Sequence, residues 1–115
     1  MKLIVAGGRG YHLTQADYLR LNEIHVKTRI LTLVSGGASG ADADGEEWAR
    51  RLYIPIRRFP ADWKAHGKAA GPIRNRQMAE YADAVVLFPG GRGTENMYQE
   101  AKKAGLEIYD FRAAA

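Results

Sequence analysis

The stretch AVVLFPGGRGT, residues 84–94, decides the fold of this 115-residue chain. In it, a short apolar run rich in β-branched residues leads into a glycine-rich turn, and a helix-like stretch follows. The same arrangement occurs in LIVAGGRG at residues 3–10 and in LTLVSGGASG at residues 31–40. Because glycine lacks a Cβ, such turns bend sharply and present bare N–H groups, and a helix N-terminus attracts anions. Three such turns predict one shared phosphate-bearing ligand.

The rest of the chain alternates in the same way between strand-like and helix-like stretches. This alternation predicts one Rossmann-like α/β domain of three layers, with a doubly wound sheet of five parallel strands. We expect strands at residues 2–6, 30–35, 54–59, 83–88 and 107–111, helices at about 14–27, 41–53, 72–82 and 94–104, and a long polar loop at 60–71.

Two strand orders compete for this sheet. Order 3-2-1-4-5 brings the three glycine turns together, whereas the flavodoxin-like order 2-1-3-4-5 leaves the second turn at an edge. Since ligands of such sheets bind beyond the carboxyl ends of the strands, we predict the order 3-2-1-4-5. The domain is expected to span residues 1–112, with Ala113 to Ala115 as a tail or expression scar.

Helix signals add detail to this outline. Thr14 followed by Asp17 predicts a capping box, and the helix after it is expected to bury Ala16, Leu19 and Ile24. The last helix is expected to pack through Met97, Ala101 and Ala104 and to end at Gly105, a C-cap candidate.

Composition narrows the class of protein. The chain has no cysteine, which excludes disulfides and thiolate metal sites, and no apolar run long enough for a bilayer. We therefore expect a cytoplasmic protein without membrane contact. The net charge of +4 is spread along the chain, which does not favour nucleic acid as a partner. The three histidines lie far apart, so no metal site is expected. No cofactor is expected either.

Two common phosphate-binding motifs are absent. After Gly8 and Gly10, a dinucleotide fingerprint requires glycine where this chain has Leu13. Gly67 and Lys68 are followed by alanine, so there is no P-loop. These differences argue against an ordinary NAD dehydrogenase or an ATPase.

The motifs that are present resemble those of the SLOG superfamily over nearly the whole chain. SGGASGAD at residues 35–42 resembles the SGxAxGxD turn of its Smf/DprA branch, and PGGRGT at 89–94 resembles the PGGxGT turn of its LOG branch, the cytokinin-activating phosphoribohydrolases. RNR at 74–76 resembles a signature shared across these groups. With DW at 62–63 and HGK at 66–68, the chain is most similar to the YspA/YpsA-related group of unknown function. The resemblance implies a Rossmann-like fold that binds nucleotides or their derivatives.

The resemblance also implies phosphoribohydrolase chemistry, but one residue differs. The LOG motif continues as PGGxGTxxE with a catalytic final glutamate, and Met97 stands at that position here. A thioether cannot activate water. Whether the protein is an enzyme therefore stays open, with Glu95 and Arg76 as the candidate catalytic residues.

The leading hypothesis is a domain that binds a nucleotide or an ADP-ribose-like ligand, as a sensor, carrier or sequestering domain. Hydrolysis of the N-glycosidic bond of nucleoside monophosphates is the alternative, and single-stranded nucleic-acid binding is a third. A homodimer or higher oligomer is also expected, with Tyr18, Tyr81 and Tyr98 available for an interface.

Phosphates are expected at the second and third turns, closed over by Arg74 and Arg76, and Trp63 either stacks on a base or anchors the 60–71 loop. The candidate ligand-binding residues are Gly8, Arg9, Gly10, Ser35, Gly36, Gly37, Ser39, Gly40, Asp42, Arg74, Asn75, Arg76, Pro89, Gly90, Gly91, Arg92, Gly93 and Thr94.

Overall fold

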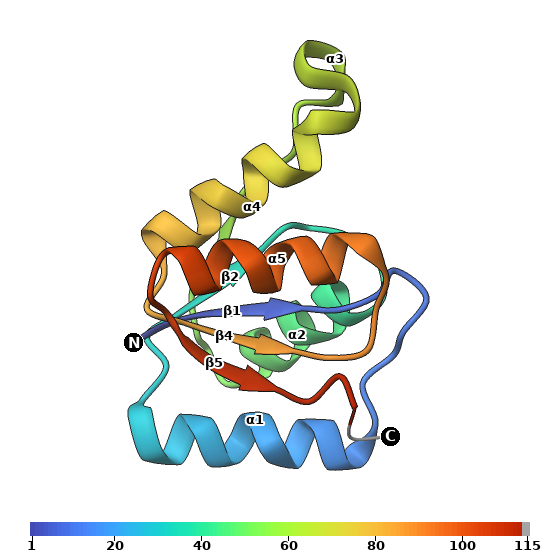
Figure 1. The fold of residues 1–115 in the computed structure, drawn as a ribbon. Helices are drawn as coiled ribbons and strands as arrows, with labels where there is room; N and C mark the ends of the chain where they lie inside the picture. The colour runs from blue at the N-terminus through green and yellow to red at the C-terminus, as the bar shows by residue number, and fades with distance from the viewer. Residues whose placement is uncertain (114–115) are drawn as a thin grey trace.

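Five parallel strands form one sheet in the order β3-β2-β1-β4-β5 (Figure 1). The structure is a computed structural model that describes residues 1–113, so the last two alanines of the expected tail lie outside the described residues. The observed order confirms the prediction and excludes the flavodoxin-like alternative. The strands are β1 (Lys2–Ala6), β2 (Thr32–Ser35), β3 (Ile56–Arg58), β4 (Ala84–Leu87) and β5 (Glu107–Asp110).

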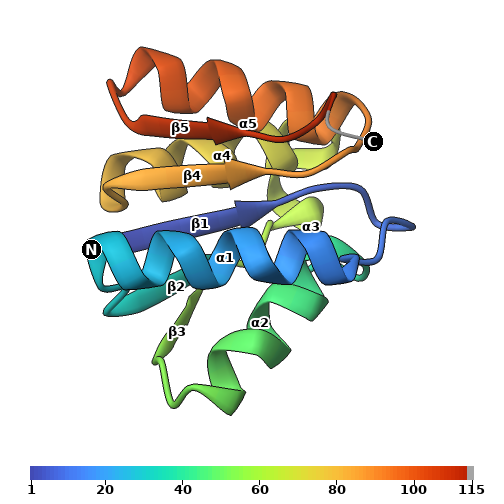
Figure 2. The ribbon, with the colours of Figure 1, turned by 90° about the horizontal axis from the view of Figure 1, so that it is seen from below.

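Helices cover both faces of the sheet (Figure 2). Alternate residues of each central strand point to opposite faces, so Leu3 and Val5 join one apolar cluster while Ile4 and Ala6 join the other. The first cluster includes residues from α1 (Gln15–Thr28) and α2 (Ala41–Arg51), and the second includes residues from α4 (Ala70–Tyr81) and α5 (Arg92–Lys103). This is the expected three-layer α/β domain.

Two of the predicted helix faces were partly wrong. The buried side of α1 carries Asp17, Leu21 and Ile24, and this stripe turns Leu19, which is 55% exposed, and Ala16 toward solvent. In α5, Met97 and Ala101 are buried as expected. Ala104 is exposed because the helix ends at Lys103.

Most of the 60–71 segment, from Trp63 onward, is helical rather than a loop. It contains a single turn, α3 (Trp63–His66), and a 3-10 turn, η1 (Gly67–Ala69), that leads directly into α4. The Asp62 side chain accepts a hydrogen bond from the Ala65 N–H and so caps α3. We call residues 60–69 the arm, because they extend away from the sheet (Figure 1).

None of the helices in residues 1–113 combines the length and the apolar character that crossing a membrane requires.

Candidate functional site

The three glycine turns meet beyond the carboxyl ends of β1, β2 and β4, which are neighbours in the sheet. Gly8 joins all three turns: its N–H donates to the Pro89 carbonyl at 2.9 Å, and its carbonyl accepts from the Ala41 N–H at 3.3 Å. The Ser39 hydroxyl also donates to the Arg9 carbonyl at 3.1 Å. The turns therefore form one interlocked backbone unit.

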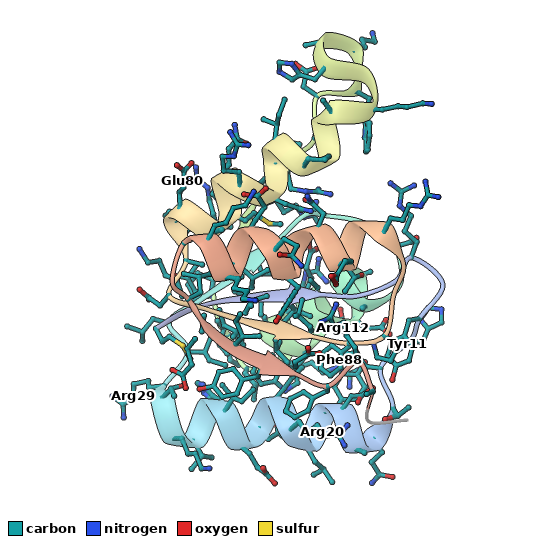
Figure 3. The ribbon with its side chains drawn as sticks, in the orientation of Figure 1. Tyr11, Arg20, Arg29, Glu80, Phe88 and Arg112 are labelled. Carbon is teal, nitrogen blue, oxygen red and sulfur yellow. The ribbon has the colours of Figure 1, made fainter. Side chains whose placement is uncertain are left out.

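Aromatic packing supports this unit from one side of the sheet. Tyr11, just after the first turn, stacks on Phe88, just before the third, with ring centroids 6.4 Å apart (Figure 3). The Tyr11 hydroxyl donates to Asp17 at 2.6 Å. The first and third turns are thus tied together by side chains as well as by backbone.

Some turn glycines are needed for this packing and others are not. Gly40 has a φ of +73°, and an added Cβ there would overlap the carbonyl oxygens of Gly8 and Arg9. In contrast, a Cβ added at Gly91 or Gly93 would meet no atom within 4 Å, and neither residue has a positive φ. Packing within the domain does not explain why Gly91 and Gly93 are glycines.

The second turn is filled by the protein's own side chains. The Gly37 N–H donates to Ser35 Oγ at 3.0 Å, and the Ala38 N–H donates to Asp42 Oδ2 at 3.3 Å. Arg74 Nη1 donates to the Gly36 carbonyl at 2.8 Å. The amides of Gly37 and Ala38 therefore already have acceptors.

Burial shifts the pKa values of two ionisable groups at this turn. It raises the pKa of Asp42 to about 6, although the Ala38 N–H and the Arg74 guanidinium act in the opposite direction. Burial also lowers the pKa of Arg74, which the Asp42 carboxylate partly offsets. A carboxyl group that is half-ionised near pH 6 and mostly ionised at neutral pH therefore lies next to the second turn.

The first turn of α5 is left open. Its N-cap residue is Gly91, which provides no side chain to accept from the first helical N–H groups. These N–H groups have no partner within a helix, and together with the helix dipole they attract anions. The start of α5 is therefore suited to an anionic group.

A cleft of about 580 Å³ lies in front of these turns. Its lining includes four basic residues and one carboxylate, Asp42, so the cleft is electropositive overall. Its floor is apolar, with Val5, Met78 and Met97. The basic residues are Arg9, Lys68, Arg74 and Arg92, and the remaining lining residues are Ala6, Gly7, Gly8, Ala38, Trp63, Gly71, Pro72, Asn75, Gly91, Gly93, Thr94 and Asn96.

The predicted site residues fall into two groups. Gly8, Arg9, Asp42, Arg74, Asn75, Gly91, Arg92, Gly93 and Thr94 line the cleft. Gly10, Ser35, Gly36, Gly37, Ser39, Gly40, Pro89 and Gly90 belong to the turns but not to the cleft lining.

The two candidate catalytic residues lie outside the cleft lining. The Arg76 side chain is 65% exposed, and its guanidinium lies 3.7 Å from Glu100. Glu95 pairs with Arg112 at 2.6 Å, and both line a second hollow beside the third turn. The structure therefore does not bring Glu95 and Arg76 together.

The RNR motif has three different roles. Arg74 reaches the second turn, while Arg76 points to α5. Asn75 lies between them and joins α4 to the start of α5, because its Nδ2 donates to Asn96 Oδ1 at 2.9 Å and to the Gly93 carbonyl at 3.3 Å. Nothing in the sequence indicated Asn96 as part of the site.

No metal centre is evident in residues 1–113, since no three His, Asp or Glu side chains gather there in a way that could hold an ion.

The parallel sheet and its interlocked turns define a Rossmann-like α/β domain of the SLOG kind. A family model described as YspA, cpYpsA-related SLOG matches residues 1–66. The chain belongs to this family.

Three similar proteins extend this finding. The Gene 61 protein of Mycobacterium phage D29 is 38% identical over 98 residues, which cover 78% of each chain. The X-ray structure of TM1055 matches 93% of this chain and 71% of its own with a TM-score of 0.72 at 20% identity. DNA processing protein A (DprA) from Streptococcus pneumoniae matches 95% of this chain with a TM-score of 0.73 at 16% identity, and the match spans 49% of that protein. The two structures show a shared fold.

Proposed function

We propose that this domain binds a nucleotide or a nucleotide derivative in the cleft, with a phosphate group at the start of α5. One observation carries the proposal: Gly91 and Gly93 line the cleft at an uncapped helix start, and packing does not require either of them to be a glycine. Close approach of an anionic ligand to the backbone accounts for both glycines.

The third turn is a better phosphate site than the second. The amides of Gly37 and Ala38 already donate to side chains of the protein, and the Asp42 carboxylate there would repel a phosphate. A carboxylate is a good acceptor for hydroxyl groups. We therefore assign the α5 start to phosphate and the Asp42 side of the cleft to ribose hydroxyls.

The side chains of the cleft give less support to hydrolysis. Met97 is 1% exposed and lies on the cleft floor, and Glu95 is held by Arg112 outside the lining. Asp42 is the carboxyl group that remains in the lining, and it interacts with the second turn. Binding without hydrolysis is the function that these residues support best.

Isothermal titration calorimetry with AMP, ADP-ribose, NAD and cyclic dinucleotides tests the proposal. We expect at least one of them to bind, and Arg92→Gln to weaken that binding about 10-fold, because a charge-assisted hydrogen bond to phosphate contributes roughly 1.5–3 kcal/mol. Lys27→Gln is the matched control, because it removes a positive charge from α1, on the opposite face of the sheet. Failure of every phosphate-bearing ligand to bind at millimolar concentration would reject the proposal.

A further inference from the structure

We propose that the arm presents Trp63 as a stacking surface for the planar base of a nucleoside phosphate, whose phosphate group lies at the start of α5. This inference rests on the proposed function and narrows it. It assigns the ligand class to nucleoside phosphates, as opposed to sugar phosphates, pyrophosphate or inorganic phosphate.

Trp63 is placed as a binding residue rather than as a core residue. It is 50% exposed, lines the cleft, and belongs to neither apolar cluster of the domain. The other tryptophan, Trp48, differs on each point: it is 6% exposed, packs in the first cluster, and donates through Nε1 to Asn22 at 2.9 Å. Core packing therefore explains Trp48 but not Trp63.

The arm holds the indole in place without covering it. Trp63 is the first residue of α3, which Asp62 caps through the Ala65 N–H at 3.1 Å. The far edge of the indole lies against the first turn of α4, since a Cβ added at Gly71 would lie 3.5 Å from Trp63 Cη2. One edge of the ring is thus supported, while half of the residue stays accessible.

The cleft offers different chemistry at its two ends. Gly91, Arg92 and Gly93 form the anion-binding end, and Trp63 of the arm and Pro72 of α4 provide an apolar surface, beside which Lys68 is the arm's one charged residue in the lining. A nucleoside phosphate has the same division, with a charged phosphate and a flat π-face. Every base has a π-face, so stacking gives affinity with little discrimination among bases. A ligand without a base leaves the Trp63 surface unused.

AMP and ribose 5-phosphate separate base recognition from phosphate recognition, because they share the sugar and the phosphate. In calorimetry with the natural chain, we expect AMP to bind about 10-fold more tightly, since removal of one base–aromatic stack commonly weakens binding by roughly that factor. Trp63→Ala is expected to reduce AMP affinity to that of ribose 5-phosphate and to leave ribose 5-phosphate binding unchanged. Trp63→Phe, which keeps an aromatic face, is expected to retain most of the affinity for AMP.

Fluorescence gives a second, direct measurement. In Trp48→Phe, Trp63 is the remaining tryptophan, and we expect AMP but not ribose 5-phosphate to quench its emission. Equal affinities for the two ligands, together with no effect of Trp63→Ala, overturn base stacking and leave the phosphate proposal intact. Binding of neither ligand, nor of any nucleotide in the wider panel, overturns both proposals.

Discussion

The starts of α1 and α5 both follow a glycine turn, but their polar groups are satisfied differently. At α1, Thr14 Oγ1 accepts from the Asp17 N–H at 3.2 Å, and the Asp17 carboxylate accepts from the Thr14 N–H at 3.0 Å and from the Tyr11 hydroxyl at 2.6 Å. At α5, the N-cap is Gly91, which has no side chain to do this. The chain satisfies one helix start and leaves the other open to the cleft.

The start of α2 lies between those of α1 and α5 in how well its polar groups are satisfied. Its first-turn aspartate, Asp42, shows this. Burial raises the pKa of both Asp17 and Asp42, but at Asp17 the hydrogen bonds from Tyr11, Thr14 and Arg20 more than offset it, so the pKa of Asp17 is lowered. At Asp42 burial dominates and the pKa rises to about 6. Asp17 therefore stabilises the fold when ionised, whereas ionised Asp42 costs stability, which is compatible with the proposed role of Asp42 toward ribose hydroxyls.

The Asp42→Asn substitution has the largest expected effect on the free energy of unfolding. The folded-state pKa of about 6 lies above the ordinary value of 3.8, so ionisation of Asp42 destabilises the natural chain as pH rises through this window. At about 1.4 kcal/mol per pH unit, the asparagine variant should be more stable by up to about 3 kcal/mol above pH 6. The two proteins should be equally stable below about pH 4. Urea unfolding at several pH values measures this difference.

Glu23→Gln is the control for Asp42→Asn, because it makes the same carboxylate-to-amide change at an exposed position on α1. The same asparagine variant should bind a nucleotide less tightly, since a neutral amide is a weaker acceptor for ribose hydroxyls. A variant less stable than the natural chain at pH 8 would show that Asp42 is structural, as Asp17 is.

Thr14→Ala removes the cap at α1 and has the next largest expected effect. Loss of an N-cap side chain costs about 1 kcal/mol, and the helix start at α1 lies away from the cleft lining. We expect a lower midpoint in urea unfolding and unchanged nucleotide affinity by calorimetry. Thr14→Ser keeps the hydroxyl and should restore stability. A loss of affinity with Thr14→Ala would mean that the two helix starts are coupled.

How well the sequence predicted each feature depended on whether local or tertiary interactions determine it. The strand order followed from the requirement that the three glycine turns meet at one ligand site, and the Thr14–Asp17 cap followed from local side-chain chemistry. The buried face of α1 did not follow from local chemistry. Packing against the sheet buries Asp17, Leu21 and Ile24 and leaves Leu19 exposed. The helical arm was missed because polar residues and Gly67 are typical of loops.

The candidate site shows the same division. Glycine motifs identified the turns, but not which glycines the packing requires: Gly40 is enclosed by backbone, whereas Gly93 faces open space. Arg74 and Arg76 look alike in the sequence. Their positions on α4 distinguish them: Arg74 reaches the second turn, whereas Arg76 lies near Glu100.

Gly93→Ala is the smallest expected change in stability and the sharpest test of the open helix start. Alanine is a better helix former than glycine, and its Cβ would meet nothing within 4 Å, so the variant should be more stable by up to about 1 kcal/mol. If phosphate approaches this backbone, the methyl group must displace it, and affinity for AMP should fall. Gly10→Ala also places a Cβ in open space but outside the cleft lining, and it should leave affinity unchanged. A Gly93→Ala variant that is stabilised and still binds AMP at full affinity would show that the phosphate does not bind at the start of α5.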